Sequence, residues 1–333
     1  MNNVCNTVKA KIQMTSPIPF GTTPEHVLIT GATGFIGKLL VRALVEQGHH
    51  VIILTRNRAK AARQFDATVT CIEDLNDLPT TQHIDVIINL AGARILGWRW
   101  TPARKQVLRQ SRIGTTQNIV NWIARADHKP RLLLSASAIG YYGVQARTDT
   151  AALTEDSAPQ AIFMSRLCQE WEMAAHAAAQ HGVKVICTRF GLVLGDEGAL
   201  PMMLLPIRLG LGGRLGDGKQ SLSWIHVHDL LRAIAHLWNI PHGEQTEIDT
   251  YNFTAPQYVT QEVFSQTAAK ILHRPCIFPT PAFAMKLLLG EQADLLLEGQ
   301  RVSSAKLQAS GFEFSFPDLQ SALENIICKN HIG

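Results

Sequence analysis

Apolar residues along the first half of the chain follow two alternating patterns. Short, almost continuous apolar runs predict buried strands, and longer segments with apolar residues three or four positions apart predict helices. Strands are expected at 26–30, 50–55, 68–72, 84–90 and 131–137, and helices between them at 36–48, 57–64 and 102–126. Apolar strands that alternate with helices predict a parallel sheet covered on both faces, which is a doubly wound α/β fold of the Rossmann type.

The pattern changes in the second half of the chain. A helix near 160–181 and a strand at 183–190 continue the alternation, but after Gly191 the sequence is rich in glycine and proline. The strands expected there, at 222–227 and 250–254, are short. We therefore expect a smaller substrate lobe beside the Rossmann core.

The end of the sequence predicts helices over 280–330 with one short piece, GFEFSF, at 311–316. Four segments follow from the whole pattern: a flexible N-terminal extension over 1–24, a Rossmann core over 25–195, a mixed substrate lobe with returning core strands over 196–280, and a small C-terminal domain over 281–330.

Composition and charge narrow the class of protein. No apolar run in the sequence is long enough to span a bilayer, and the first 24 residues lack the continuous apolar core of a secretory signal. The six cysteines are scattered without a C-x-x-C pair, which favours reduced thiols in a cytoplasmic protein over disulfides or a zinc site. A formal net charge of +4 without a long basic block does not indicate nucleic acid. We expect a small-molecule substrate and no membrane partner, and a homodimer stays open.

Three glycines, Gly31, Gly34 and Gly37, stand three residues apart between the first strand and the first helix. A strand that turns into a helix through glycines places backbone N–H groups where an anion binds. Glycines at a tight turn also serve a purely structural purpose. A second strand that ends about twenty residues later completes the fingerprint, and this agreement favours dinucleotide binding over a plain turn.

The end of the second strand selects the dinucleotide. An NAD site usually has Asp or Glu there to accept from the ribose hydroxyls. Here the strand ends in Thr55-Arg56-Asn57-Arg58, without a carboxylate. Arg56, and with it Arg58, could pair with a 2′-phosphate, although both could also be solvated residues at the start of a helix. The sequence therefore favours NADP(H).

Other candidate contacts of the cofactor follow the later strands. Asp74 comes after the third strand and could lie beside the adenine, and small residues at the end of the fourth strand let the backbone approach the cofactor. The contacts predicted from the residues are Gly31, Thr33, Gly34, Phe35, Ile36, Gly37, Thr55, Arg56, Asp74, Leu90, Ala91 and Gly92.

A metal site is not predicted. His226 and His228 are separated by one residue and should share a strand face, but no third ligand is evident, and a strand-end histidine more often bonds the backbone. The apolar stretch around 202–213 is expected to cover the nicotinamide rather than touch a membrane. Arg208 and Arg214 either point into the substrate cleft toward a negative group or lie on the surface.

Eight motifs occur in the order found in one protein family: ITGATGFIG, INLAG (88–92), RWT (99–101), SRIGTT (111–116), SASAIGYYG (135–143), TRFGLVLG (188–195), LPIRLGLGG (205–213) and WIHVHDL (224–230). Over about residues 26–328 the chain resembles the epimerase-like, atypical branch of the extended short-chain dehydrogenase/reductases. Its tail, 287–317, resembles that family's small C-terminal domain of unknown function.

The resemblance implies a Rossmann domain that binds NADP(H), a substrate cleft under the C-terminal lobe and a substrate that is generally undefined. It also implies that Arg112 and Val193 contact the cofactor or line its nicotinamide end. One position departs from the family, because an acidic residue is common directly after LAG and this chain has Ala93.

Most members of the wider superfamily transfer a hydride with the help of a Tyr-x-x-x-Lys pair, whose spacing places phenol and ammonium on one helix face. No tyrosine of this chain has a lysine four residues later. Counted from Ser137, the serine of the usual site, the two positions fall on Phe163 and Leu167. Neither side chain can carry a proton.

The remaining candidates for proton transfer are Ser137, Tyr141 and Tyr142, all near the carboxyl end of the fifth strand. Ser137 could act with water, or a tyrosine could approach from another direction. Packing is favoured for each tyrosine because no lysine is placed to lower its pKa. Two hypotheses follow: an NADP(H)-dependent oxidoreductase or epimerase-type enzyme, and a non-catalytic sensor that binds NADPH.

Overall fold

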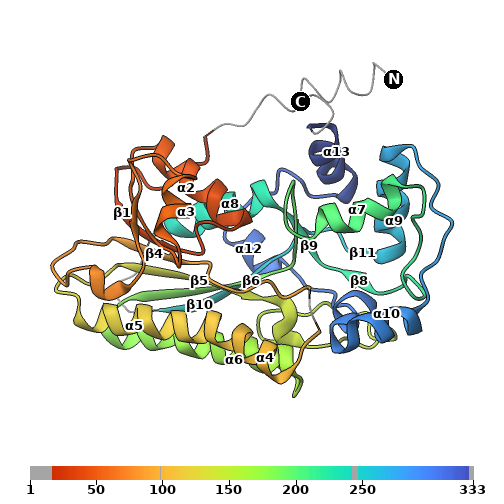
Figure 1. Ribbon diagram of the computed structural model, residues 1–333, viewed down its shortest axis with the longest axis horizontal. Coiled ribbons are helices and arrows are strands. Elements are labelled where there is room, and N and C mark those ends of the chain that lie inside the picture. The colour runs from red at the N-terminus through yellow and green to blue at the C-terminus, as the bar shows by residue number, and fades with distance from the viewer. Residues whose placement is uncertain (1–16, 98, 242–246, 330–333) are drawn as a thin grey trace.

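The computed structural model describes residues 17–97, 99–241 and 247–329. Seven strands form its central sheet: β1 (His26–Thr30), β2 (His50–Leu54), β3 (Thr70–Ile72), β4 (Val86–Asn89), β5 (Leu132–Ala138), β6 (Lys184–Phe190) and β10 (Ile248–Phe253). All neighbouring pairs are parallel, and the order across the sheet is β10-β6-β5-β4-β1-β2-β3 (Figure 1). The expected doubly wound parallel sheet is confirmed.

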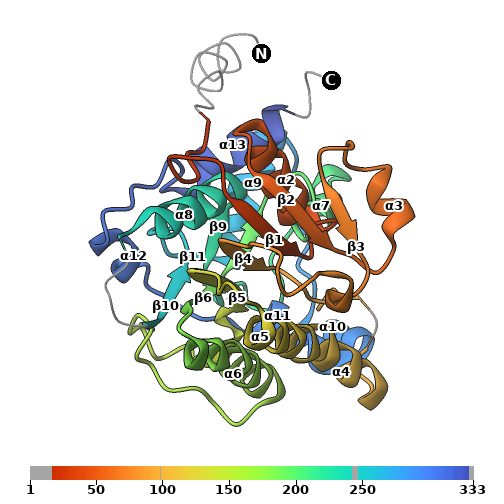
Figure 2. The ribbon, with the colours of Figure 1, turned by 90° about the vertical axis from the view of Figure 1, so that its left-hand side faces the viewer.

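Both faces of the sheet are buried because successive side chains of each strand point to opposite sides. In β1, Val27 and Ile29 enter one core cluster and Leu28 enters the other. Helices α2 (Phe35–Glu46) and α8 (Val227–Asn239) cover the first face, and α5 (Thr115–Arg125) and α6 (Phe163–His176) cover the second (Figures 1 and 2). The near-continuous apolar runs of the sequence have this physical origin.

Three shorter helices complete the core: α3 (Arg58–Ala62), α4 (Pro102–Arg109) and α12 (Ala305–Ala309). The segment expected as one helix over 102–126 is interrupted, because a π-helical turn, Gln110–Gly114, lies between α4 and α5. Short 3-10 turns follow β3, β5 and α6, at Leu75–Asp77, Ile139–Tyr142 and Ala177–His181.

A smaller lobe lies beside the carboxyl ends of β5 and β6 (Figure 1). It contains β7 (Leu192–Leu194) paired with β9 (Trp224–His226), and β8 (Ser221–Leu222) paired with β11 (Val259–Thr260). Its helices are α7 (Leu200–Arg208), α9 (Gln261–Leu272), α10 (Ala282–Leu289), α11 (Asp294–Leu297) and α13 (Leu319–Lys329), with a 3-10 turn at Gly290–Ala293. Helices α7, α9 and α13 share a buried apolar cluster with Trp224.

The start of the chain differs from the expectation. Part of the presumed N-terminal extension is packed, since Ile18 and Phe20 are buried in the main core; residues 1–16 lie outside the described residues. The short piece at 311–316 forms a loop, whose Ser315 and Phe316 N–H groups donate to the buried carboxylate of Asp229.

Within the described ranges, no helix is long and apolar enough to cross a membrane.

Candidate functional site

The turn after β1 requires two of its three glycines for reasons internal to the chain. Gly31 has a φ of +70°, and a Cβ there would lie 2.4 Å from the carbonyl oxygen of Leu90. A Cβ at Gly37 would lie 2.4 Å from the carbonyl oxygen of Gly31. Real Cβ atoms do not approach that closely, so these two glycines are needed for the close passage of α2 over the strand ends.

Gly34 differs from its two neighbours. A Cβ on it would meet only the carbonyl oxygen of Gly31, at 3.2 Å, within a 4 Å radius. Gly34 is also the N-cap of α2, where no side chain supplies a capping hydrogen bond and the first turn has no acidic residue. Thr33 and Gly34 are exposed, and Phe35 and Ile36 are half-buried. The helix therefore offers an open, electropositive N-terminus, which is the usual place for a phosphate group.

A loop from the lobe lies against this N-terminus. The ring of Phe35 is so close to Gly195 that a Cβ there would meet its Cζ atom at 2.3 Å, and Gly198 faces the same ring. Lys38 on α2 forms an ion pair with Glu197 in that loop. This loop follows β7, whose Val193 is half-buried and pairs with Ile225 of β9. The structure thus brings the segment after Val193 to the turn.

The end of β2 presents Arg56 on the surface. Thr55 accepts a hydrogen bond on its hydroxyl from the N–H of Asn57 at 3.3 Å, and Asn57 caps α3. The Arg58 N–H donates to the Glu73 carboxylate at 2.8 Å. The Arg56 side chain is exposed, so it is accessible to a ligand at this edge.

Asp74 has a local partner. Its carboxylate accepts from the N–H of Asn76 at 2.8 Å and caps the Leu75–Asp77 turn. The structure gives this side chain a capping function, and its predicted position beside an adenine stays a prediction.

After β4, the backbone of Leu90 and Ala91 lies against Gly31, and Gly92 faces the guanidinium of Arg112. A Cβ at Gly92 would lie 3.0 Å from that guanidinium. Arg112 donates to the carbonyl oxygens of Leu108 and Ala93 at 3.3 and 3.1 Å, and its guanidinium lies 5.2 Å over the Trp171 ring. Burial lowers the pKa of Arg112 from its ordinary value. The π-helical turn that carries Arg112 is the kind of local irregularity that often occurs at functional sites.

Beneath these strand ends lies a cluster of buried polar side chains. Asn89 accepts from the Thr30 hydroxyl at 2.6 Å and donates to Thr116 at 2.8 Å and Ser135 at 3.3 Å. Trp171 donates its indole N–H to Thr116 at 3.1 Å. The cluster ties β1, β4, β5 and α5 together at the edge where the ligand is expected.

Ser137 does not face open space. It is buried, and its hydroxyl donates to the Glu172 carboxylate at 2.6 Å. Glu172 in turn accepts two hydrogen bonds of 2.8 Å from the Arg189 guanidinium, and both side chains are at most 5% exposed. Burial lowers the pKa of Arg189, but the hydrogen bonds and charge of Glu172 outweigh this effect and raise the pKa above its ordinary value. Ser137 is thereby bound to a buried ion pair.

Tyr142 belongs to the same network. Its hydroxyl donates to the Asn252 side-chain oxygen at 2.6 Å and accepts from Arg189 at 2.9 Å. Burial raises the pKa of Tyr142 to about 12, although Arg189 and Asn252 act in the opposite direction. The contacts of Ser137 and Tyr142 explain their positions by internal bonding and give no support to the predicted proton transfer by either residue.

Tyr141 is placed differently. It is half-buried, its ring lies 3.4 Å from the Arg189 guanidinium carbon, and it meets Tyr142 edge-on at 5.5 Å. Its carbonyl oxygen accepts from the Ser165 hydroxyl. The ring is thus held against Arg189 and Tyr142, while the residue as a whole is half-buried. Phe163 and Leu167, at the positions of the usual pair, pack in a small apolar cluster.

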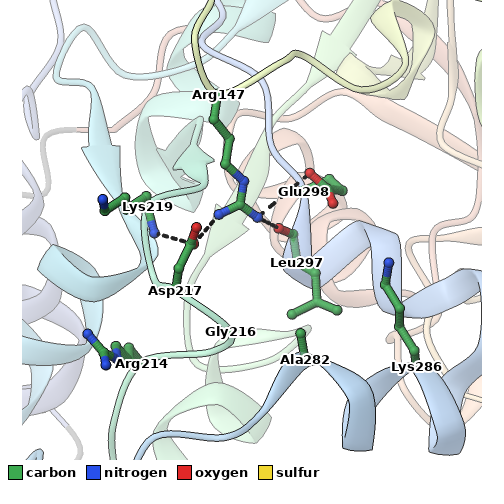
Figure 3. Close-up of a pocket in the computed structure, with 9 residues that line it drawn as sticks. All are labelled: Arg147, Arg214, Gly216, Asp217, Lys219, Ala282, Lys286, Leu297 and Glu298. Atoms are coloured by element: carbon green, nitrogen blue, oxygen red, sulfur yellow. Dashed lines mark hydrogen bonds and ion pairs between the residues drawn. The ribbon is translucent and has the colours of Figure 1, made fainter.

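A cavity of about 610 Å³ opens between the lobe and the loop after Tyr142 (Figure 3). Four cationic side chains line it, together with Asp217 and Glu298: Arg147, Arg214, Lys219 and Lys286. Arg147 forms ion pairs with Asp217 and with Glu298, the latter at 3.8 Å, and donates to the Leu297 carbonyl oxygen at 2.7 Å. Figure 3 shows Arg147 between Asp217 on one side and Glu298 and Leu297 on the other. Of the two arginines considered from the sequence, Arg214 lines this cavity.

Comparison with known proteins identifies the family. The model of the NAD dependent epimerase/dehydratase family matches residues 27–252, and a domain of unknown function (DUF1731) matches 280–326. The chain belongs to the NAD dependent epimerase/dehydratase family.

Relatives in this family extend over almost the whole chain. The epimerase family protein SSP1921 of Staphylococcus saprophyticus is 39% identical over 306 residues, which cover 91% of this chain and 99% of that protein. YfhF of Bacillus subtilis is 38% identical over 308 residues and covers 91% and 98%. The sequence-based identification of an epimerase-like protein with a small C-terminal domain is confirmed.

Solved structures are similar to this fold. Human epimerase family protein SDR39U1 (isoform 2), solved with NADPH, has a TM-score of 0.80 and 33% identity, covering 92% of this chain and 99% of that one. MoeE5 in complex with UDP-glucuronic acid and NAD has a TM-score of 0.72 at 22% identity, covering 92% and 100%. The second likeness shows the fold alone.

Two histidines of a family motif were misplaced by the sequence analysis. His226 ends β9 and His228 lies in the first turn of α8, so they do not share a strand face. His226 caps the helix by accepting from the His228 N–H at 3.1 Å, and its ring stacks on Phe316 at 4.0 Å. The strand-to-helix junction explains the first of these histidines as a capping residue.

The sequence analysis missed the partners that fix the predicted residues. Glu172, Arg189 and Asn252 hold Ser137 and Tyr142, and they come from α6, β6 and β10. The sequence contained one indication of these partners, which is a charged residue inside a segment expected to be buried. Arg189 stands in a predicted strand and Glu172 in a predicted helix. A charge in a buried strand needs an opposite charge nearby, and that requirement could have linked the two residues.

Proposed function

We propose that this chain binds NADP(H) and works as an oxidoreductase or epimerase-type enzyme on a small carbonyl or sugar-like substrate. The observation that carries the proposal is the space at Gly34. The chain itself leaves this position open and uncapped at the N-terminus of a twelve-residue helix. A dinucleotide pyrophosphate fits such a turn, and the human relative solved with NADPH supports the same choice.

Each part of the sheet edge has a role in this proposal. The turn residues Gly31–Gly37 hold the pyrophosphate, and Arg56 pairs with the 2′-phosphate. Arg112, fixed beside Gly92, and Val193 lie toward the nicotinamide end. Bound NADP(H) supplies the hydride chemistry. The chain orients the cofactor and the substrate, and its lobe excludes water from the reacting carbon.

We assign the proton step to Tyr141. The hydroxyls of Ser137 and Tyr142 are already bonded within the buried network, whereas the Tyr141 ring is held by Arg189 and is partly accessible. The Tyr141 hydroxyl gives its proton to a substrate oxygen when a carbonyl is reduced and takes it back in the reverse direction.

Cofactor titration tests the first half of the proposal. Removing the Arg56 guanidinium loses a charge-assisted contact, which is typically worth about 1.5–3 kcal/mol, or roughly ten- to a hundredfold in affinity. We expect wild type to bind NADPH more tightly than NADH and Arg56→Ala to lose that preference. Lys60→Ala, which removes an exposed charge from the next helix, should keep it. Equal affinities in wild type, measured by calorimetry, would contradict NADP(H) specificity.

The packed side chains at Phe163 and Leu167 favour a second candidate function, an NADPH-binding sensor. A measurement of catalytic turnover distinguishes the enzyme from the sensor. We expect Tyr141→Phe to slow NADPH oxidation by about 10²- to 10⁴-fold on a panel of small carbonyl and sugar-nucleotide substrates, without loss of NADPH affinity. Tyr258→Phe is the matched control, because Tyr258 stacks on Arg301 elsewhere in the lobe. Absence of turnover on the whole panel by wild type would favour the sensor.

A further inference from the structure

Helix α7 of the smaller lobe is apolar on two sides. Its buried side packs in the cluster shared with α9 and α13. Its other side exposes Met202, Leu205 and Leu209, which stand three and four positions apart along the helix. A helix that is apolar on all sides is normally buried completely. Within the described part of the chain, the outer side of α7 is therefore an apolar surface without a covering element.

Helix α10 and the extended segment before it expose further apolar side chains. Ile277 and Phe278 lie in the extended segment and are at least half exposed. Phe283 and Leu287 stand four positions apart on α10, so they share one face of the helix, and they are 75% and 74% exposed. Apolar side chains that gather on a surface typically mark a site of interaction.

These apolar residues belong to two segments of the lobe, 198–216 and 263–290. Of the fourteen large apolar residues that are exposed in the described ranges, nine lie in these two segments. The segments run side by side, because a backbone bridge joins Gly212 to Cys276 and main-chain hydrogen bonds continue beyond it. Figure 1 shows α7, α9 and α10 together at the right-hand end of the molecule. The exposed residues thus belong to one region of the lobe.

The same two segments are strongly basic. They contain five Lys and Arg residues and no Asp or Glu, whereas the formal net charge of the whole chain is +4, so the rest of the chain is close to neutral. All five cations are exposed, and among the described residues none of them forms an ion pair. They are Arg208, Arg214, Lys270, Arg274 and Lys286. We call the exposed apolar and basic side chains of residues 198–216 and 263–290 the cationic apolar surface.

Acidic residues at the border of this surface compensate little of its charge. Glu291 forms an ion pair with Lys105 at 2.6 Å, and Asp217 forms one with Arg147. Glu262 lines a small cavity together with Arg214 and is the acidic residue nearest to the two segments on that side. The surface therefore keeps an excess of positive charge.

Charge and composition together select the class of partner. A second copy of this chain would bring like charges together across a two-fold contact, which is unfavourable. Protein interfaces are enriched in Tyr and Trp, and neither segment contains one. Exposed Leu, Ile, Met and Phe beside Lys and Arg are instead typical of helices that lie in the interface of a membrane with anionic lipids.

We propose that the cationic apolar surface attaches the protein to a lipid bilayer that contains anionic lipids. The outer side of α7, with Phe283 and Leu287 of α10, enters the boundary between head groups and acyl chains, and the five cations bind the head-group phosphates. For this surface, the proposal replaces the expectation from the sequence that the chain has no membrane partner. It does not depend on the proposed enzymatic function.

Flotation with lipid vesicles tests the proposal. We expect wild type to float with vesicles of two parts phosphatidylcholine and one part phosphatidylglycerol, to float much less with phosphatidylcholine alone, and to detach as salt is added. Replacing both Phe283→Ser and Leu287→Ser should weaken binding about tenfold or more, and Lys286→Gln about fivefold. The matched controls are Met173→Ser on α6, where Met173 is 67% exposed, and Lys60→Gln on α3, and both should bind like wild type.

Several results would overturn the proposal. They are no flotation with either kind of vesicle, equal flotation with both kinds, or equal weakening by the control variants. A dimer of wild type that becomes a monomer in Phe283→Ser/Leu287→Ser, measured by sedimentation, would assign the surface to a second copy. Binding of a peptide of alternating Glu and Leu without flotation would assign it to an acidic protein. NADPH titration and a thermal melt should give wild-type values for every variant, so a failure of the proposed function is distinguishable.

Discussion

At the end of β1 the chain leaves the N-terminus of α2 without a capping side chain, whereas at the ends of β5 and β6 the polar side chains bond to one another. Gly34 contributes no side chain to the first region. Ser137, Glu172, Arg189 and Tyr142 are joined by short hydrogen bonds in the second. Both regions belong to the same edge of the sheet.

This difference distinguishes a region that can bind a ligand from a region that stabilises the fold. An uncapped helix end has hydrogen-bonding capacity for a ligand, while a buried ion pair uses its capacity within the protein. The sequence analysis named Ser137 and the two tyrosines as the candidates for proton transfer, but the structure shows that two of these three side chains bond within the protein. Only Tyr141 combines a fixed ring with partial accessibility.

A large effect is expected from breaking the network of Ser137, Glu172, Arg189 and Tyr142. Glu172→Ala removes the partner of a buried guanidinium, and the loss of one member of a buried pair typically costs about 3–5 kcal/mol. We expect the free energy of unfolding, measured with urea, to fall by that amount. Arg189 would be left with an unpaired buried charge.

A control lies two residues away on the same helix. Glu170 pairs with Arg109 at the surface, where the side chains are 33% and 42% exposed, and such pairs contribute about 0–1 kcal/mol. Glu170→Ala should therefore change the urea midpoint little. Similar losses in both variants would show that the Glu172 network is not a special support of the fold.

A smaller effect is expected at the open region, and it concerns binding rather than folding. Gly34→Val places a side chain where the pyrophosphate is proposed to meet α2, and we expect NADPH affinity to fall at least about a hundredfold, or roughly 2.7 kcal/mol. The only near contact of its Cβ is one carbonyl oxygen at 3.2 Å, so the variant should fold. Fluorescence titration and a thermal melt measure the two properties separately.

Gly37→Val sharpens the comparison. Its Cβ would approach backbone atoms at 2.4 and 2.6 Å, so we expect loss of the folded protein itself. If Gly34→Val still binds NADPH with wild-type affinity, the glycine serves only the turn and the proposed cofactor site is wrong.

Much of the fold could be predicted because it depends on local patterns. The apolar runs that became β1, β2, β4, β5 and β6 were located within two residues of their observed ends, since strands buried on both faces need continuous apolar sequence. The interruption of 102–126 at Arg112 could not be predicted, because a π-helical turn leaves no periodic pattern in the sequence, and the contacts of Arg112 with Gly92 and Trp171 form only in the fold.

Part of the site could also be predicted from the sequence, and part could not. Local spacing was enough for the turn residues, because the three glycines, the strand before them and the helix after them are neighbours in sequence. Ser137, by contrast, has its partner Glu172 35 residues away, and Tyr142 bonds Asn252 110 residues away. Single-sequence patterns do not report such contacts.

By itself, the sequence determined the doubly wound sheet, the glycine turn, the lack of a Tyr-x-x-x-Lys pair and the family to which the chain belongs. Only the tertiary structure decided which glycine is free for a ligand, which hydroxyls are already bonded and where the cations of the lobe gather. The physical reason is the separation, along the sequence, between the residues that interact. Helix and strand propensities act over a few residues, whereas burial, ion pairing and cavities depend on segments that folding brings together from far apart.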